Sequence, residues 1–136
     1  MRALDTYIIE DSPVIRESLI ATLEELVPVR VVGVAEDETA AMRWLNEPSH
    51  AVDLVIVDIF LKSGSGLGVL RAAQAVPQRY RLVVLSNHAT PDMRRKCLAL
   101  GADRVFDKST EIDELILYCD RLAVSGDRRG GMGALA

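Results

Sequence analysis

The sequence has few aromatic residues and no surplus of positive charge. Only 4% of its 136 residues are aromatic, and its formal net charge is −4. Proteins that bind the nucleic-acid backbone need an excess of Lys and Arg, and those that bind single strands stack bases on aromatic rings. We therefore expect no direct contact between this chain and nucleic acid.

Cysteines are equally scarce, and long apolar runs are missing. Cys97 and Cys119 both lie within apolar patterns of helical spacing and form no C-x-x-C pair, so packing is favoured over a disulfide or a metal site. No apolar stretch approaches the roughly 20 residues of a membrane span, and the amino-terminal segment turns acidic too early for a signal peptide. We expect a reduced, cytoplasmic protein that does not contact a membrane.

What the sequence does contain is an alternation of strand and helix patterns. Strands are predicted at 6–10, 29–35, 53–58, 81–86 and 104–108. Helices are predicted at 13–27, 38–46, 67–75, 91–100 and 111–124. The central strands are apolar without alternation, which is typical of parallel strands covered on both faces. In the first helix, Ser12 is the expected cap, and Ile15, Leu19, Leu23 and Leu26 are expected to face the core.

Five βα units predict an α/β fold with a doubly wound parallel sheet. The expected strand order is 2-1-3-4-5, the flavodoxin-like order, with helices on both faces. Ligands in such sheets bind outside the carboxyl ends of the strands, near the point where the winding reverses. The informative residues are therefore those that end the strands.

Acidic, hydroxyl and ammonium groups stand at these ends. They are Glu10 and Asp11 after the first strand, Asp58 at the end of the third, Ser86 at the end of the fourth and Lys108 at the end of the fifth. Two carboxylates about 4 Å apart repel by about 4 kcal/mol at an effective dielectric constant of 20. A hard cation such as Mg²⁺ relieves that repulsion, because it prefers carboxylate, water and phosphate oxygens.

With a cation held by the first two acids, Asp58 is free to act as a nucleophile toward phosphorus. The cation and Lys108 would share the charge of the transferred group. The hydroxyl of Ser86 can donate a hydrogen bond to a phosphoryl oxygen. The strand ends therefore predict phosphoryl chemistry at Asp58.

Four segments together carry a family signature: "EDS" (10–12), "VDIFLKSGSG" (57–66), "LSN" (85–87) and "GADRVFDKS" (101–109). Over residues 5 to 124 the chain resembles the receiver domain of two-component response regulators. The resemblance implies that a histidine kinase, a phosphotransfer protein or a small phosphodonor phosphorylates Asp58, and that Ser86 and Lys108 contact the phosphoryl group. The metal is expected to be Mg²⁺, with Mn²⁺ as an alternative. Its implied ligands are Glu10, Asp11, Asp58 and the backbone carbonyl of Phe60, with Asp11 bound directly.

The sequence also departs from the pattern of that family. Val105 stands three residues before Lys108, where the family usually has a switch aromatic, and Phe106 follows it. The usual coupling of a rotating ring to Ser86 is therefore not expected. Phe60 and His88 occupy positions that tune the lifetime of the phosphoryl group in the family.

The resemblance implies a phosphorylation-controlled switch of a bacterial two-component system. Its only enzymatic activity would be its own phosphorylation and dephosphorylation. Phosphorylation is expected to change the surface formed by the helix of 91–100, the strand of 104–108 and the helix of 111–124, and so to control binding of a downstream protein. Leu117 and Tyr118 are candidates for exposed contacts there, including those of a homodimer.

Residues 1–124 are expected to form the receiver domain, and 125–136 a flexible, Gly-rich tail. We favour a stand-alone receiver over a receiver fragment of a longer, DNA-binding response regulator. A phosphatase with an aspartate nucleophile on a similar fold is a weaker alternative, because the chain has no insertion that could form a cap. A degenerate receiver that serves only as an interaction scaffold is disfavoured by the intact residue set.

Overall fold

The computed structural model describes residues 3–61, 63–76, 80–87 and 89–125. The strands are β1 (Leu4–Ile9), β2 (Val29–Ala35), β3 (Leu54–Asp58), β4 (Arg81–Ser86) and β5 (Arg104–Asp107). The helices are α1 (Pro13–Leu26), α2 (Glu38–Leu45), α3 (Gly66–Ala73), α4 (Pro91–Ala99) and α5 (Ile112–Ser125). His88 and the predicted tail from residue 126 onward lie outside the described residues. Among the described residues, no helix is long and apolar enough to span a membrane.

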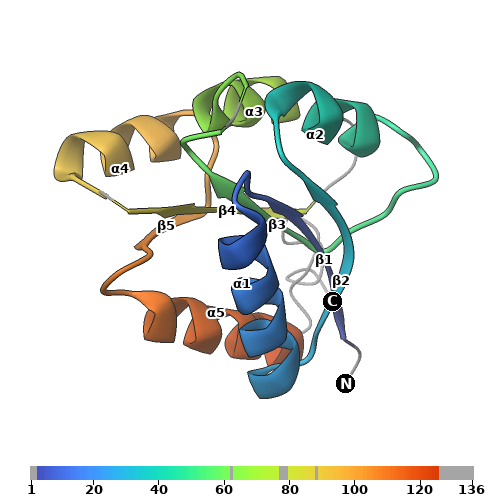
Figure 1. Ribbon diagram of the computed structural model, residues 1–136, viewed down its shortest axis with the longest axis vertical. Helices are drawn as coiled ribbons and strands as arrows, with labels where there is room; N and C mark the ends of the chain where they lie inside the picture. The colour runs from blue at the N-terminus through green and yellow to red at the C-terminus, as the bar shows by residue number, and fades with distance from the viewer. Residues whose placement is uncertain (1–2, 62, 77–79, 88, 126–136) are drawn as a thin grey trace.

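All neighbouring strands pair in parallel, in the order β2-β1-β3-β4-β5. The predicted doubly wound sheet is thereby confirmed. Helices α1 and α5 cover one face of the sheet, and α2, α3 and α4 cover the other (Figure 1). The crossover from β1 through β2 to β3 places β1 between β2 and β3, and the carboxyl ends of β1 and β3 therefore lie side by side.

Strand β3 shows why this sequence forms a covered parallel strand. All five of its residues are buried. Leu54 and Ile56 belong to the core beneath α1 and α5, while Val55 and Val57 belong to the core beneath the other three helices. Successive side chains of a strand point to opposite faces, so an unbroken apolar run fills both cores at once.

The beginnings of the helices are set by short polar side chains. Ser12 accepts a hydrogen bond from the backbone N–H of Ile15, and Pro13 occupies the first turn, as predicted. The predicted core stripe of α1 is only half right. Leu19 and Leu23 are buried, but Ile15 is 39% exposed and Leu26 is 58% exposed. These two residues lie in the first and last turns of α1.

The two cysteines pack as expected. Cys97 on α4 and Cys119 on α5 are both free and fully buried, and they belong to the cores on opposite faces of the sheet. Burial raises the pKa of the Cys119 thiol to about 12. Both side chains therefore act as small apolar groups of the core.

Candidate functional site

The carboxyl ends of four neighbouring strands form the site. Glu10 and Asp11 follow β1, Asp58 ends β3, Ser86 ends β4, and Lys108 follows β5. Because β1, β3, β4 and β5 are consecutive in the sheet, these residues lie along one edge. Sequence reasoning placed them there from the strand pattern alone.

Three of these residues form a compact acidic group. Carboxylate oxygens of Glu10, Asp11 and Asp58 lie within 4.8 Å of one another. Glu10 is 3% exposed and Asp58 is 6% exposed, whereas Asp11 is partly exposed. Oxygen ligands at this spacing, with one of them open to solvent, suit a hard divalent cation that keeps part of its water shell.

Lys108 partly neutralises the acidic group. Its Nζ lies 2.6 Å from Oε1 of Glu10 and 3.5 Å from Oδ2 of Asp58, and its side chain is only 11% exposed. The second oxygen of Glu10, Oε2, accepts a hydrogen bond of 3.1 Å from the backbone N–H of Ser12. Both oxygens of Glu10 are therefore engaged, which leaves Asp11 and Asp58 as the more available ligands.

The environment of Asp58 raises its pKa to about 6. The main cause is burial, which disfavours the charged form, and the nearby carboxylate of Glu10 adds to the effect. Lys108 and a 3.3 Å hydrogen bond from the backbone N–H of Phe60 act in the opposite direction. Asp58 thus titrates close to neutral pH, as is common for groups that take part in chemistry.

Ser86 supplies a hydroxyl without a partner. Its side chain is fully buried, and its Oγ forms no hydrogen bond with any of the residues that the structure describes. Its backbone carbonyl accepts a 2.8 Å hydrogen bond from the N–H of Lys108, which ties the ends of β4 and β5 together. A buried hydroxyl without a partner is costly, which makes Ser86 a candidate for contact with a ligand at this edge.

The turn after β3 returns to contact the backbone of Asp58 and Ile59 through Gly66. The backbone N–H of Gly66 donates a 2.9 Å hydrogen bond to the carbonyl of Ile59. A Cβ atom added at Gly66 would lie 2.2 Å from the carbonyl oxygen of Asp58, a distance that no side chain can adopt. Glycine at this position is therefore a requirement of the site.

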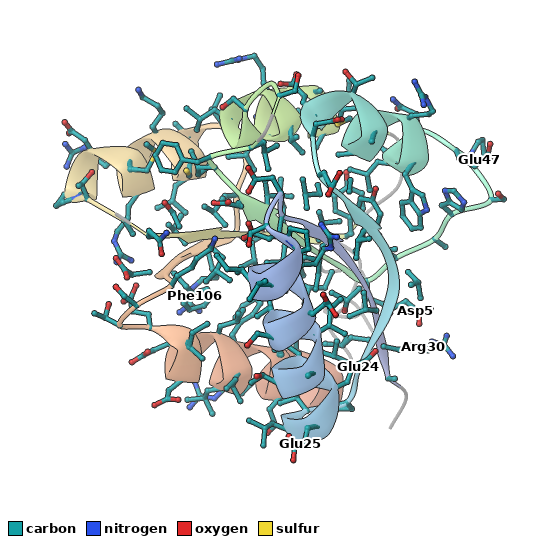
Figure 2. All side chains as sticks on the ribbon, viewed as in Figure 1. Asp5, Glu24, Glu25, Arg30, Glu47 and Phe106 are labelled. Atoms are coloured by element: carbon teal, nitrogen blue, oxygen red, sulfur yellow. The ribbon has the colours of Figure 1, made fainter. Side chains whose placement is uncertain are left out.

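Three further predicted site residues lie in the described part of the chain, and none of them belongs to the group of charged side chains: Phe60, Val105 and Phe106. Phe60 is 57% exposed, and its carbonyl remains only an expected metal ligand. Val105 and Phe106 are both buried, on opposite faces of β5. Phe106 lies between the sheet and α5, 5.9 Å from the ring of Tyr118 (Figure 2).

Sequence reasoning missed two features of this region. Arg16 donates a 2.8 Å hydrogen bond from Nη1 to the backbone carbonyl of Glu10, next to the acidic group. No sequence signal indicates this contact. A groove of about 450 Å³ runs between α1 and α5 and reaches Lys108. The exposed Val14 lines it. Nothing in the pattern of α1 signals the groove, because it depends on how two helices pack.

Comparisons with known proteins agree on the identity of this fold. A family model described as the response regulator receiver domain matches residues 6–120. The Fimbriae Z protein of Salmonella typhimurium is 24% identical over 115 residues, which are 85% of this chain and 54% of that protein. The signal receiver domain of NarL from Mycobacterium tuberculosis is 26% identical, with a TM-score of 0.74 and coverage of 89% of this chain and 98% of that one.

A two-component response regulator of the LuxR family from Aurantimonas sp. shares the fold with a TM-score of 0.77, at 23% identity and with 94% of this chain and 89% of that chain covered. The chain spans about half the length of the curated relatives that it matches. With a family match over most of its length and the charged strand ends described above, the chain belongs to the response regulator receiver domain family.

Proposed function

We propose that this protein is a phosphorylation-controlled switch that accepts a phosphoryl group on Asp58 from a histidine kinase, a phosphotransfer protein or a small phosphodonor. The observation that carries the proposal is the cluster at the sheet edge. Asp58 shares it with two other carboxylates within 4.8 Å, with Lys108 3.5 Å away and with the unpartnered hydroxyl of Ser86 on the next strand.

In this proposal the acidic group holds Mg²⁺, or Mn²⁺ as an alternative. Asp11 and Asp58 would bind it directly, the carbonyl of Phe60 would complete the protein ligands, and Glu10 would support the site through its charge. The cation supplies charge neutralisation for the incoming phosphoryl oxygens. The ionised carboxylate of Asp58 would attack phosphorus as the bond from phosphorus to the donor breaks, which is the P–N bond of a phosphohistidine or the P–O bond of acetyl phosphate. The donor would then leave as histidine or acetate, and Lys108 and Ser86 would contact the transferred phosphoryl oxygens.

The proposed output is a change in the surface of α4, β5 and α5. Leu98 on α4 is 51% exposed and Leu117 on α5 is 47% exposed, and such residues are suitable contacts for a downstream protein or a second copy of the chain. Tyr118 is less available than the sequence suggested, because it is partly buried against Phe106 and beneath Arg104.

The names of several curated relatives favour one context for this output. They are called transcriptional regulatory proteins, and this chain matches less than half of the length of each. Control of a transcription regulator is therefore a second candidate role, either through a separate partner or within a longer protein. Bacterial relatives also favour a cytoplasmic signalling protein of bacterial type.

The proposal is tested by incubating the protein with Mg²⁺ and acetyl phosphate and then measuring its intact mass. We expect one added phosphoryl group on the wild type, none after the metal is chelated and none in Asp58→Asn. Sizing of the labelled protein then reports whether it associates. An unlabelled wild type, or equal labelling of Asp58→Asn, would refute the assignment of Asp58. Steady turnover of a generic phosphate ester would instead indicate a phosphatase.

A further inference from the structure

Four residues beyond the charged site form a closed ring of hydrogen bonds, here called the polar ring: Ala89, Arg94, Asp107 and Glu111. Arg94 donates from Nε to the carbonyl of Ala89 at 2.9 Å and from Nη2 to Oε1 of Glu111 at 2.7 Å. The same Oε1 accepts the backbone N–H of Asp107 at 2.8 Å. The ring closes where Oδ2 of Asp107 accepts the backbone N–H of Ala89 at 3.3 Å.

The polar ring joins segments that are distant in sequence and adjacent to the proposed site. Ala89 lies three residues after Ser86, and Asp107 immediately precedes Lys108. Arg94 lies in the first half of α4, and Glu111 immediately precedes α5. The two groups proposed to contact the phosphoryl group are therefore each connected through a few backbone bonds to the ring. A displacement of the backbone at either one can therefore reach the ring through the neighbouring residues.

Arg94 extends this connection into β5. Its Nη1 donates a 3.2 Å hydrogen bond to the carbonyl of Val105. The side chain of Val105 is aliphatic and buried in the core. It therefore offers no polar or aromatic group that could connect the site to the surface by changing its rotamer. A single planar guanidinium thus contacts two backbone carbonyls and one carboxylate, a geometry that Lys cannot reproduce.

The exposure of the polar ring suits a connection that rearranges. The side chains of Arg94 and Glu111 are 34% and 30% exposed. Solvent can therefore replace broken hydrogen bonds, whereas a fully buried charged network would be very costly to open. The hydrogen bond from Arg94 also lowers the pKa of Glu111, so that this carboxylate stays ionised within the ring.

The neighbouring Arg95 shows what an ordinary surface ion pair looks like in this helix. It pairs with Asp92 of the same helical turn, and the two side chains are 71% and 88% exposed. That pair lies entirely within α4. Arg95 is therefore a matched control: it is the adjacent residue, of the same type and also paired, but its ion pair links no second element to α4.

From this geometry we infer that the polar ring couples the β4–α4 loop to β5 and α5, and that Arg94 is the positioning residue through which phosphorylation at Asp58 reorganises the surface of α4, β5 and α5. This inference rests on the proposed function. It adds the physical connection between site and surface, which is a polar network in this chain. Arg94 contacts the ring and the carbonyl of Val105, away from the proposed metal ligands, so it acts on the response and not on the chemistry.

The test compares amide hydrogen exchange in α4 and α5 with and without Mg²⁺ and acetyl phosphate, while intact mass records the labelled fraction. In the wild type and in Arg95→Ala, we expect labelling to change exchange in these helices by about tenfold. In Arg94→Ala, we expect normal labelling of Asp58, but a change of less than about twofold in α5. A merely structural role would alter exchange equally in both states and would leave the ratio between them intact.

Glu111→Gln provides a second, milder variant, because an amide oxygen keeps both acceptor positions but loses the charge. We expect an intermediate response from this variant alone. The double variant that combines Glu111→Gln with Arg94→Ala should lose no more than Arg94→Ala, because both changes break the same ring. The coupling role is wrong, while the proposed function stands, if Arg94→Ala is labelled and its exchange responds like that of the wild type. The same conclusion follows if the losses of response caused by Glu111→Gln and Arg94→Ala add in the double variant. If the wild type takes up no phosphoryl group, both proposals fail.

Discussion

Two buried aspartates flank β3, and they differ in almost everything except burial. Asp53 precedes the strand and is 0% exposed; Asp58 ends it and is 6% exposed. Asp53 accepts the backbone N–H of Asp5 at 2.9 Å, donates its own N–H to the carbonyl of Asp5 and accepts the N–H of Arg81 at its carbonyl. It joins the amino ends of three strands.

Asp58, in contrast, faces two other carboxylates, and Lys108 compensates them only in part. At the amino edge of the sheet, the charge of Asp5 is paired with Arg30 at 2.6 Å (Figure 2). One end of β3 therefore uses a carboxylate to satisfy backbone groups, and the other end concentrates charge that is not balanced. Burial alone therefore does not distinguish the two acids; the neighbours of each carboxylate do.

The difference between the two aspartates would disappear if both could be phosphorylated. We expect Asp53→Asn to retain labelling by acetyl phosphate in Mg²⁺ and Asp58→Asn to lose all of it. Asp58 has a proposed cation site and a lysine beside it, whereas Asp53 is engaged with backbone groups. Intact mass followed by peptide mapping measures the site. Labelling that disappears in a well-folded Asp53→Asn variant would contradict the distinction.

Removing the carboxylate at Asp53 should have the largest effect on stability. We expect Asp53→Ala to lower the free energy of unfolding by about 3 kcal/mol, because the N–H of Asp5 loses a charged acceptor. Urea denaturation measures this change. The matched variant is Asp53→Asn, in which an amide oxygen can still accept that hydrogen bond, so a smaller loss is expected. Equal losses in the two variants would argue against the hydrogen bond as the cause.

Removing the charge of Asp58, at the other end of β3, should raise the free energy of unfolding instead of lowering it. The pKa of Asp58 is raised to about 6 from its ordinary value of 3.8, so the folded state favours the protonated form. The stability that this group contributes is present below about pH 4 and is lost as the pH rises through about 6. At about pH 8 without divalent cations, Asp58→Asn should therefore raise the free energy of unfolding by about 2 kcal/mol.

The gain should shrink toward zero near pH 4, where the wild-type carboxyl is largely neutral in the folded state. Urea titrations at several pH values in a chelating buffer measure the trend. Excess Mg²⁺ serves as the control, since a bound cation offsets the repulsion in the wild type. A gain that is independent of pH would show that the ionisation of Asp58 is not its source.

A smaller effect should appear in metal affinity. Because roughly one carboxyl in ten is ionised one pH unit below its pKa, Mg²⁺ should bind about tenfold more weakly at about pH 5 than at about pH 8. Calorimetry measures the affinity at both values. Asp58→Asn should bind more weakly overall and with a flatter dependence on pH. An unchanged slope in this variant would assign the titration to another group.

The sequence predicted most of the fold because local signals and global topology agree in it. The apolar run before Asp58 and the cap at Ser12 each favour one structure, and parallel strand order then follows from the handedness of the crossovers. The same logic brought the charged residues to one edge. Strand order predicts where the backbone of each strand ends, so it predicted the positions of their Cα atoms.

What the sequence could not predict depends on side-chain contacts between elements. Ile15 was expected to face the core but proved exposed, and it lines the groove between α1 and α5. Arg94 is another example, because its three acceptors come from separate segments of the chain. Periodicity reports which face of a helix is apolar, but it does not report where a long polar side chain finds its partners.

Gly66 has a consequence for the direction in which this molecule can respond. The first residue of α3 is pressed against the carbonyl of Asp58 so closely that not even a methyl group would fit between them. The main chains of Gly66 and Asp58 are thus in close contact, with no space for a side chain between them. We therefore expect a rearrangement that follows from added charge at Asp58 to begin on the side of β4 and β5, whose ends carry Ser86 and Lys108.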